Sequence, residues 1–304
     1  SIEQNEHFGI GTNGEMKNIS FGLFAAEEIV SASGTSIPAN GLIEIVSLNE
    51  DGTATIKTDL PYGRYYVQEI ATDSHYKLSD AKYPIIFEYV GQDTAVVKIA
   101  VNDGKAIKND LIYGSVSGKK VDEDGNALGG AMIGLFRTDD GEFTKENALM
   151  TTTSAEEGSF SFENIPCGTW YVREIEQPTG FVLDDTIYPV TIGTDGQVVE
   201  IEIVNEYGRG NIHLTKVDSE YPDNKLTGAV FEVYKDSNNN GKLDDSDELL
   251  GTLTEKEIGE YGMNDLFYGR YFIKETKAPD GFVLDTDVYE VVIDTDGKTY
   301  DVEN

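Results

Sequence analysis

Tyr-Gly-Arg-Tyr-Phe-Ile-Lys-Glu, at residues 268–275, is one of three copies of a pattern from which the fold can be derived. The other copies are Tyr-Gly-Arg-Tyr-Tyr-Val-Gln-Glu at 62–69 and Cys-Gly-Thr-Trp-Tyr-Val-Arg-Glu at 167–174. Side chains alternate between the two faces of a β-strand, so an aromatic residue, a β-branched residue and the final glutamate share one face in each copy. Each copy is therefore predicted to be a strand with one buried face.

The glutamates that close the three copies are Glu69, Glu174 and Glu275. They lie on the apolar face, where a carboxylate is costly unless it is protonated or paired. They are 105 and 101 residues apart, which divides the 304-residue chain into three domains of similar length. The predicted first, middle and third domains are residues 1–112, 113–207 and 208–304.

Strand-like runs broken by Gly, Asp and Asn dominate the chain, which predicts an all-β fold. Seven short strands per domain are typical of a Greek-key, Ig-like β-sandwich, and very short linkers predict an extended rod. The strands expected in the middle domain are 115–121, 131–137, 148–153, 159–163, 169–176, 187–192 and 197–205. Those of the third are 211–217, 229–235, 249–254, 261–264, 270–276, 288–293 and 298–304. Those of the less regular first are 6–10, 19–25, 42–48, 53–58, 64–70, 83–90, 95–101 and 105–109.

The chain is strongly acidic, with 56 Asp and Glu against 23 Lys and Arg. Such a charge repels nucleic acid and anionic membranes, so neither is an expected partner. No apolar run is long enough to span a membrane and no signal peptide begins the sequence, which we therefore expect to be a piece of a longer protein. The single cysteine, Cys167, excludes an intrachain disulfide and is expected to pack as a small apolar residue.

Motifs of enzymatic chemistry are weak. Gly9-Ile-Gly11-Thr-Asn-Gly14 matches a dinucleotide-binding pattern, but no helix is predicted after it, and a turn is the simpler interpretation. The three histidines are far apart in sequence and lack metal-ligand spacing. No Gly-x-Ser-x-Gly elbow occurs. The chain is therefore predicted not to be an enzyme.

A lysine and an asparagine repeat together with the glutamate in the last two domains. Lys120 and Lys216 lie on the apolar face of the first expected strand, and each is followed by Val-Asp. Asn205 and Asn304 end the last expected strands, in phase with apolar residues. Each of these domains thus places Lys, Glu and Asn on the buried face of its first, a middle and its last strand.

These residues stand in a wider pattern. In the third domain Lys-Val-Asp is followed by Leu-Thr-Gly-Ala-Val-Phe-Glu-Val-Tyr and by Tyr-Phe-Ile-Lys-Glu-Thr-Lys-Ala-Pro-Asp-Gly-Phe. This pattern resembles the SpaA and Cna B-type (prealbumin-like) domains of Gram-positive surface adhesins and pilins, strongly in the third and middle domains and weakly in the first. The resemblance implies spontaneous isopeptide bonds promoted by a buried acid: Lys120–Asn205 with Glu174, and Lys216–Asn304 with Glu275.

Elementary chemistry supports such bonds. Burial lowers the pKa of a lysine and leaves a neutral amine that can attack the asparagine carboxamide. Burial raises the pKa of a glutamate, so its proton can polarise the carbonyl and pass to the departing ammonia. The alternative is structural: lysines that snorkel from strand ends, asparagines that end strands, and glutamates that accept backbone hydrogen bonds. Two sets in matching phase favour the bonds.

The first domain has an incomplete set. Glu69 is present, and Asn109 matches the closing asparagine by its phase and by its sequence distance to Lys120. The position of the missing lysine is expected near Phe8, and the nearby Lys17 belongs to a turn. We therefore expect no bond in this domain, or one of unusual geometry.

An acidic segment of the third domain, residues 236–247, has the spacing of a calcium-binding loop. A glycine stands at loop position 6, and oxygen ligands fall at positions 1, 3, 5, 7, 9 and 12. The alternative is a solvated hairpin tip, but the register of these features predicts calcium, with Asp rather than Glu at position 12 as in dockerin-type loops. The candidate ligands are Asp236, Asn238, Asn240, the Lys242 carbonyl, Asp244 and Asp247.

Together these features predict a structural stalk in a cell-wall surface protein or pilus of a Gram-positive bacterium, outside the cell. The expected partner is the peptidoglycan-anchored parent protein or the pilus. An alternative is an adhesive module whose first domain binds a host protein or glycan. An extracellular enzyme, or an accessory domain of one, is the weakest hypothesis.

Overall fold

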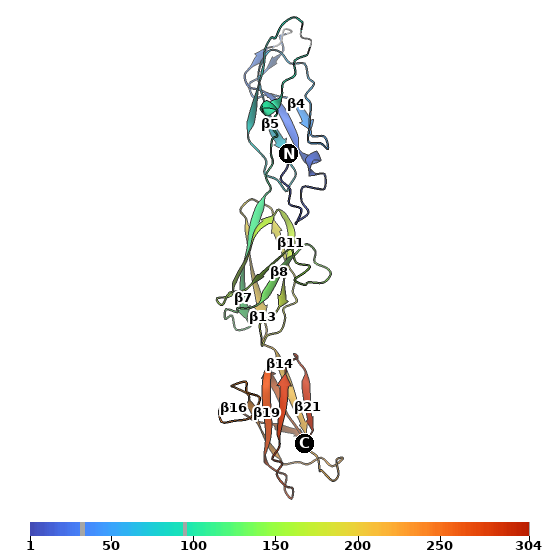
Figure 1. Cartoon of the computed structure of the whole chain (residues 1–304), viewed down its shortest axis with the longest axis vertical. Coiled ribbons are helices and arrows are strands. Elements are labelled where there is room, and N and C mark those ends of the chain that lie inside the picture. The colour runs from blue at the N-terminus through green and yellow to red at the C-terminus, as the bar shows by residue number, and fades with distance from the viewer. Residues whose placement is uncertain (31–33, 94–95, 304) are drawn as a thin grey trace.

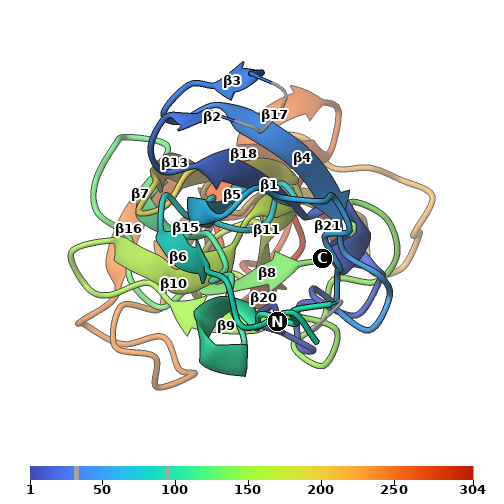
Figure 2. The same ribbon diagram turned by 90° about the horizontal axis from the view of Figure 1, so that it is seen from above.

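A computed structural model of the chain describes residues 1–30, 34–93 and 96–303. Three β-domains follow one another along a single long axis (Figure 1). Viewed along that axis, the domains project onto one another (Figure 2). The prediction of an all-β fold with three tandem domains in an extended rod is confirmed. No helix in the described part of the chain is long and apolar enough to cross a membrane.

The middle domain has two sheets that enclose one core, with strand orders β10-β7-β13 and β12-β11-β8-β9. β7 lies at the centre of its sheet, antiparallel to β10 and parallel to β13, so the first and last strands of the domain are neighbours. The strands are β7 (Tyr113–Asp122), β8 (Met132–Phe136), β9 (Met150–Thr153), β10 (Ser159–Pro166), β11 (Gly168–Glu176), β12 (Tyr188–Ile192) and β13 (Val198–Asn205).

The third domain repeats this arrangement with one extra strand, in the orders β17-β18-β14-β21 and β16-β15-β19-β20. Its first strand is again parallel to its last. The strands are β14 (Arg209–Thr215), β15 (Val230–Lys235), β16 (Glu248–Thr252), β17 (Thr254–Glu257), β18 (Glu260–Phe267), β19 (Gly269–Lys277), β20 (Val288–Ile293) and β21 (Thr299–Glu303). The last residue of the strand predicted at 298–304 lies outside the described residues.

The first domain has one four-stranded sheet, β4-β1-β5-β6, and a two-stranded sheet, β2-β3, among its described residues. Its elements are β1 (Ser20–Ala25), β2 (Ile29–Val30), β3 (Ser36–Ile37), β4 (Leu42–Ser47), β5 (Gly63–Ala71) and β6 (Lys82–Phe87), with 3₁₀ turns η1 (Glu15–Asn18) and η2 (Val101–Gly104).

Several strands predicted for the first domain are wrong. Residues 53–58 and 105–109 form no ladder apart from an isolated bridge at Asn109, because no neighbouring strand pairs with them. The strand predicted at 95–101 begins outside the described residues, and its described part has no strand either.

The recurring strand has the predicted alternation of faces. In β11, Trp170, Val172 and Glu174 are buried, and the residues between them are more exposed. The ring of the aromatic residue is fixed by its polar atom: Trp170 Nε1 donates to the carbonyl four residues earlier at 2.8 Å. The hydroxyls of Tyr65 and Tyr271 make the same bond at 2.6 Å. The aromatic position therefore accepts Tyr or Trp, whose polar atoms reach this carbonyl.

The first domain has a core of its own, and some of its residues also enter the core of the middle domain, which the two domains therefore share. Phe8 and Ile10 pack into the cluster of the middle domain, where the rings of Phe8 and Trp170 meet edge-on with centroids 4.9 Å apart. Arg137 holds this segment by donating to the Phe8 carbonyl at 2.8 Å. The strand predicted at 6–10 is therefore wrong, because these residues form turns whose side chains cover the end of the middle domain.

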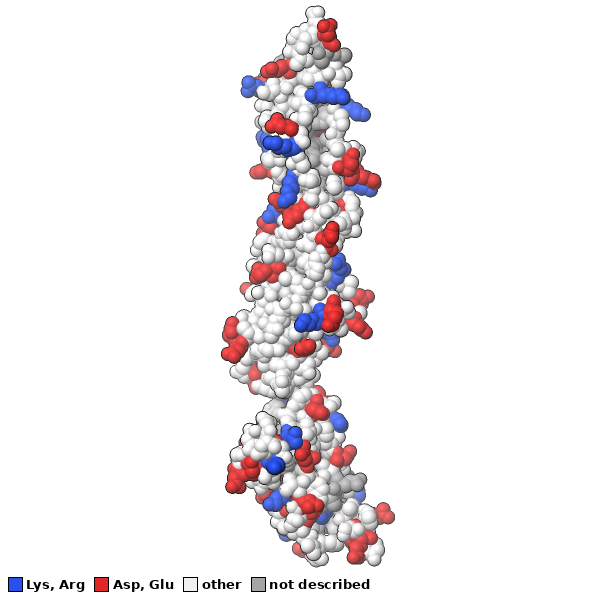
Figure 3. Space-filling view, viewed as in Figure 1, with Lys and Arg blue, Asp and Glu red and all other residues white. Residues whose placement is uncertain are grey.

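The middle and third domains meet through a smaller contact. The Tyr207 hydroxyl donates to Asp122 at 2.7 Å, and the Arg209 guanidinium pairs with Glu123 and lies over the ring of Phe267. The rod is narrow at this junction, and acidic side chains are spread along the whole visible face with basic ones between them (Figure 3). The two junctions therefore differ: at one, apolar residues of the first domain lie within the core of the middle domain, and at the other a smaller set of aromatic and polar contacts is made.

This difference predicts unequal effects of two phenylalanine truncations. Phe8→Ala should destabilise the middle domain by about 3 kcal/mol or more, because it leaves a cavity in a shared core. Phe267→Ala, at a side chain 46% exposed, should cost less than about 1 kcal/mol. Chemical unfolding followed by the fluorescence of Trp170, the only tryptophan, measures the first loss, and calorimetric unfolding of the third domain measures the second. Equal losses of stability would contradict the shared core.

Candidate functional site

Three side chains from separate strands meet in the core of the middle domain. Lys120 of β7 and Asn205 at the end of β13 are fully buried, and Glu174 of β11 is 1% exposed. Lys120 Nζ lies 3.6 Å from Glu174 Oε1 and donates to the Ile203 carbonyl at 3.3 Å. Asn205 Nδ2 donates to Glu174 Oε2 at 2.7 Å. The amine and the carboxamide thus converge on one carboxyl group, from the three strands on which the sequence predicted them.

Burial decides the electrostatics of this group. Loss of solvent raises the pKa of Glu174 and lowers the pKa of Lys120, and the attraction between the two opposes both shifts. Two buried atoms, Glu174 Oε1 and Asn205 Oδ1, have no hydrogen-bond partner among the described residues. Burial therefore shifts both side chains toward their neutral forms.

A backbone N–H holds each of the three recurring glutamates. Glu174 Oε2 accepts from the N–H of Asp184 at 2.8 Å, and Glu275 Oε2 accepts from that of Asp285 at 2.7 Å. Glu69 Oε2 accepts from the N–H of Ser79 at 2.8 Å. The donor lies ten residues after the glutamate each time, in a segment that the sequence reasoning left unassigned.

A second repeat accompanies this bond in the middle and third domains. The Tyr188 hydroxyl donates to Asp184 Oδ2 at 2.7 Å, and the Tyr289 hydroxyl donates to Asp285 Oδ2 at 2.6 Å. The spacing Asp-x-x-x-Tyr occurs in both domains at the same distance from the glutamate. This repeat was the signal in the sequence that could have identified the N–H donors.

In the third domain the structure brings Lys216 to Glu275, with Nζ 3.3 Å from Oε1. Glu275 is fully buried and Lys216 is 7% exposed. Asn304, the predicted acceptor, lies outside the described residues. The last strand has a different register from its counterpart: Thr215 lies opposite Glu303, one residue before Asn304.

The middle domain shows the size of that difference. Lys119, the residue before Lys120, lies opposite Glu202, three residues before Asn205. The residues opposite Lys119 and Thr215 therefore stand at different distances along the chain from the closing asparagine. The middle domain alone shows the complete set of three side chains among the described residues.

The first domain has two members of the set, the acid Glu69 and the amide Asn109. Asn109 Nδ2 donates to Glu69 Oε1 at 2.5 Å and to Thr72 Oγ1 at 3.2 Å, and both Asn109 and Glu69 are 3% exposed. The expectation of a lysine position near Phe8 is wrong, since Phe8 packs in the middle domain. Lys17 is also remote, because its Nζ pairs with Glu50 at the surface, at 2.9 Å.

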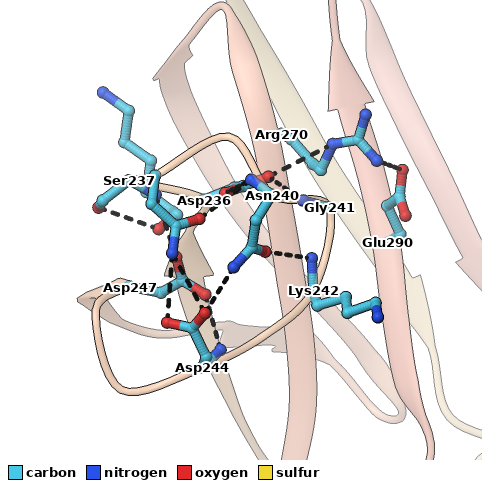
Figure 4. A network of polar contacts seen from close by, with 11 residues as sticks. Asp236, Ser237, Asn240, Gly241, Lys242, Asp244, Asp247, Arg270 and Glu290 are labelled. Atoms are coloured by element: carbon cyan, nitrogen blue, oxygen red, sulfur yellow. Dashed lines mark hydrogen bonds and ion pairs between the residues drawn. The ribbon is translucent and has the colours of Figure 1, made fainter.

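The acidic loop at 236–247 is closed by its own hydrogen bonds (Figure 4). Asp236 is buried, and its two carboxylate oxygens accept from the N–H groups of Asn240 at 3.1 Å and Gly241 at 3.0 Å. Asp247 Oδ2 accepts from the N–H of Asp244 at 2.9 Å. The predicted ligand positions 1, 5, 9 and 12, which are Asp236, Asn240, Asp244 and Asp247, therefore lie on one loop that its own hydrogen bonds close.

The side chains of this loop are rich in oxygen donors, which suits a hard cation. Hydrogen bonds from Ser246, Asn240 and Asn238 lower the pKa of Asp244, so this carboxylate stays charged. In the described part of the chain no three His, Cys, Asp or Glu side chains gather as a metal-binding group. The Asn238 and Asn240 amide nitrogens contact Asp244, and their amide oxygens accept from the backbone N–H groups of Asn240 and Lys242. The residues fit calcium by donor type.

Curated relatives match parts of this chain. Colossin-A of Dictyostelium discoideum is 24% identical over 304 residues, which cover 89% of this chain and 2% of that protein. The trypsin-resistant surface T6 protein of Streptococcus pyogenes serotype M6 is 36% identical over 80 residues, which cover 26% of this chain and 13% of that protein.

Among solved structures, the TIE protein of Bacillus anthracis has the same fold, with a TM-score of 0.61 and 22% sequence identity. The match covers 97% of this chain and 48% of that one, so the chain spans less than half the length of each of these relatives. A family model described as a prealbumin-like fold domain, SpaA, matches residues 9–105, 114–207 and 210–304. With nearly the whole chain matched in three consecutive copies, the protein belongs to the SpaA family of prealbumin-like fold domains.

Proposed function

We propose that this chain is a stalk region of a Gram-positive cell-wall surface protein or pilus subunit, closed in its middle domain by an autocatalytic isopeptide bond between Lys120 and Asn205. The observation that carries the proposal is the buried trio itself, in which amine and carboxamide converge on Glu174. A buried ion pair stabilises a fold poorly in comparison with apolar packing. A set of side chains that react to form a bond explains the burial of this trio better.

The trio supplies every group that the exchange of one amide for another needs. The neutral Lys120 amine attacks the carboxamide carbon of Asn205, and a new carbon–nitrogen bond forms. The bond from that carbon to the original amide nitrogen breaks, and ammonia leaves with the proton that Glu174 relays from the amine. Glu174 returns to its starting protonation state, and the reaction needs no oxidant or cofactor. Alignment in a packed core supplies the effective concentration that an unreactive amide requires.

The position of the bond suits a protein under tension. The chain enters the middle domain through β7 and leaves it after β13, and these strands are parallel neighbours. A bond between Lys120 and Asn205 would carry a pulling force past the residues between them. By analogy with a disulfide that closes a loop of this length, it would also restrict the unfolded chain by about 4–5 kcal/mol.

The proposed location is the outer surface of a Gram-positive cell. Of the relatives, the T6 protein is by name a surface protein of a streptococcus. The proposed partner is the longer, peptidoglycan-anchored protein or pilus of which this chain would be a part. We assign no enzymatic turnover to it, because bond closure happens once per domain. Lys216, Glu275 and Asn304 remain the proposed set in the third domain.

Calcium is the proposed ligand of the loop at 236–247. A bound cation would neutralise the charges of Asp236, Asp244 and Asp247. Arg270 Nε lies 3.5 Å from Asp236 Oδ2, so the loop is tied to strand β19 (Figure 4). Filling the site would therefore stabilise the adjoining sheet as well as the loop.

A second candidate function is adhesion by the first domain. Its surface carries an aromatic group in which the ring centroid of Tyr62 lies 5.2 Å from that of Phe87 and 6.0 Å from that of Tyr89. Tyr62 and Tyr89 are each 60% exposed, as is typical of protein and glycan contacts. Loss of binding to a host glycan or protein array in Tyr62→Ala, with Tyr221→Ala in the third domain as an exposed control, would support adhesion.

The isopeptide proposal predicts a mass deficit that depends on one lysine. The purified chain should lack one ammonia for the Lys120–Asn205 bond, and Lys120→Ala or Glu174→Gln should abolish that deficit. Lys119→Ala is the matched control, because Lys119 neighbours Lys120 on β7 but is exposed. Intact mass spectrometry with peptide mapping measures this. A wild-type chain in which Lys120 and Asn205 are both unmodified would refute the proposal.

The calcium proposal predicts stabilisation confined to the third domain. Calcium at millimolar concentration should raise its thermal midpoint and slow proteolytic cleavage within 236–247, and chelation should reverse both effects. Asp244→Ala should remove the response, whereas Asp245→Ala, at a position that supplies no predicted ligand, should keep it. Calorimetric titration that detects no calcium binding to the wild-type chain would contradict the assignment.

A further inference from the structure

The segment between β11 and β12 contacts two members of the buried trio through its backbone. The N–H of Asp184 donates to Glu174 Oε2 at 2.8 Å, and the Val182 carbonyl accepts from Asn205 Nδ2 at 2.6 Å. These two backbone groups lie two residues apart, one at the acid and the other at the amide. Residues 182–184 therefore hold both groups with which the lysine amine would react.

The Val182 carbonyl decides which way the Asn205 amide faces. A carbonyl oxygen only accepts hydrogen bonds, so the amide atom directed at it is the nitrogen. The same nitrogen also donates to Glu174 Oε2 at 2.7 Å, and Asn205 Oδ1 has no hydrogen-bond partner among the described residues. The nitrogen that would leave as ammonia is thus fixed between a backbone carbonyl and the acid.

One end of this segment is attached to the chain that follows β13. The N–H of Val182 donates to the Glu206 carbonyl at 2.8 Å. Phe181 lies opposite Tyr207 in an antiparallel bridge, and their rings stack with centroids 4.8 Å apart. These contacts keep the Val182 carbonyl beside Asn205.

The other end of the segment is held by the side chain of Asp184. Its Oδ2 accepts from the Tyr188 hydroxyl at 2.7 Å, and its Oδ1 accepts from the N–H of Thr186 at 3.0 Å. Tyr188 begins strand β12 and packs against the core of the middle domain. Burial and the bond to Asp184 raise the pKa of Tyr188, so the hydroxyl keeps the proton that it donates. Asp184 thereby ties its own N–H to a strand of the sheet.

The third domain repeats this Asp–Tyr contact. Asp285 Oδ2 accepts from the Tyr289 hydroxyl at 2.6 Å, and Asp285 Oδ1 accepts from the N–H of Asp287 at 2.9 Å. The N–H of Asp285 again donates to the acid, Glu275, which lies beside Lys216. The contact therefore occurs in both domains in which a lysine lies beside the acid.

Among the described residues, the first domain lacks this contact. Ser79 takes the place of Asp184 and has one side-chain oxygen where an aspartate has two. The Asn109 amide donates to Glu69 and to Thr72 Oγ1, not to a backbone carbonyl. No lysine in the described part of the chain pairs with Glu69. The Asp–Tyr contact thus accompanies the lysine and not the buried acid alone.

We propose that Asp184 and Tyr188 are positioning residues for the isopeptide reaction of the middle domain. They hold residues 182–184 so that one backbone carbonyl orients the leaving nitrogen of Asn205 and one N–H orients Glu174. This inference rests on the function proposed above, because it assumes that reaction.

The position of the amide nitrogen matters because this atom must gain a proton. The Lys120 nitrogen bonds to the carboxamide carbon of Asn205, and the bond from that carbon to Nδ2 breaks. Glu174 takes a proton from the amine and passes it to Nδ2, which leaves as ammonia. Nδ2 already lies 2.7 Å from Glu174 Oε2, so the proton crosses a contact that the folded domain makes in advance.

The rate of bond closure in the full chain tests the inference. The chain is made by cell-free synthesis, samples are stopped in acid at intervals, and peptide mapping by mass gives the fraction with Lys120 linked to Asn205. Tyr188→Phe, which removes one hydroxyl, should slow closure by about 10-fold or more, because a misplacement of about 1 Å can cost about 100-fold. Tyr171→Phe is the matched control and should close at the wild-type rate, because Tyr171 alternates with the buried residues of β11.

Two variants at Asp184 separate positioning from stability. Asp184→Ala removes both acceptors and should slow closure at least as much as Tyr188→Phe. Asp184→Asn keeps an oxygen for the Tyr188 hydroxyl and should restore much of the rate. The thermal midpoints of the same variants in a Lys120→Ala chain, which cannot close, measure their effect on folding alone. Rates that follow these midpoints, and not the presence of an acceptor at residue 184, would overturn the inference.

The outcomes distinguish this inference from the proposed function. Wild-type closure rates in Tyr188→Phe and Asp184→Ala, with the Lys120–Asn205 bond formed, would overturn the inference and leave the proposed function intact. Absence of the bond from the wild-type chain would refute both. If Asp184→Ala does not fold, the rate of Tyr188→Phe against that of its control still decides.

Discussion

A buried carboxyl group held by a backbone N–H is the contact on which the interior of each domain depends. The peptide N–H of Asp184 fixes one oxygen of Glu174, which leaves the other directed at Lys120. Without that N–H, a buried acid would have to find water or a cation elsewhere, at a cost of several kcal/mol. The bond also ties the segment after β11 to the core, because the donor lies ten residues beyond the acid. One hydrogen bond thus positions the acid and anchors a loop.

The sequence was most informative where side-chain phase alone decides position. Alternation placed Glu174 on the inner face of its strand, and the repeat placed Lys120 on the first strand of the domain and Asn205 on the last; the structure adds that these two strands are parallel neighbours. The alternation of side chains could not show which domain a short segment packs against. Phe8 was expected near the lysine position of its own domain, but tertiary packing draws it to Trp170 of the next domain. The pairing register could not be predicted either, because shifting a strand by two residues leaves every side chain on the same face. Only the backbone hydrogen bonds distinguish one such register from the next.

The two junctions give the rod unequal stiffness. The first is continuous with the core of the middle domain, so bending there would expose apolar surface. The second relies on Tyr207, Arg209 and Glu123, whose contacts water can replace at little cost. High salt would screen the pair of Arg209 and Glu123 and would leave the first junction unaffected. Salt thus distinguishes the two junctions.

The parallel pairing of the first and last strands also determines how much length each domain adds to the rod. Parallel neighbours run in the same direction, so the chain leaves a domain at the end opposite to its entry. A ten-residue strand such as β7 advances by about 33 Å. Insertion or deletion of a whole domain would therefore change the length of the rod by about one such strand length. The direction in which the chain runs would stay the same. Variation in domain number would then set the distance between the two ends of the rod.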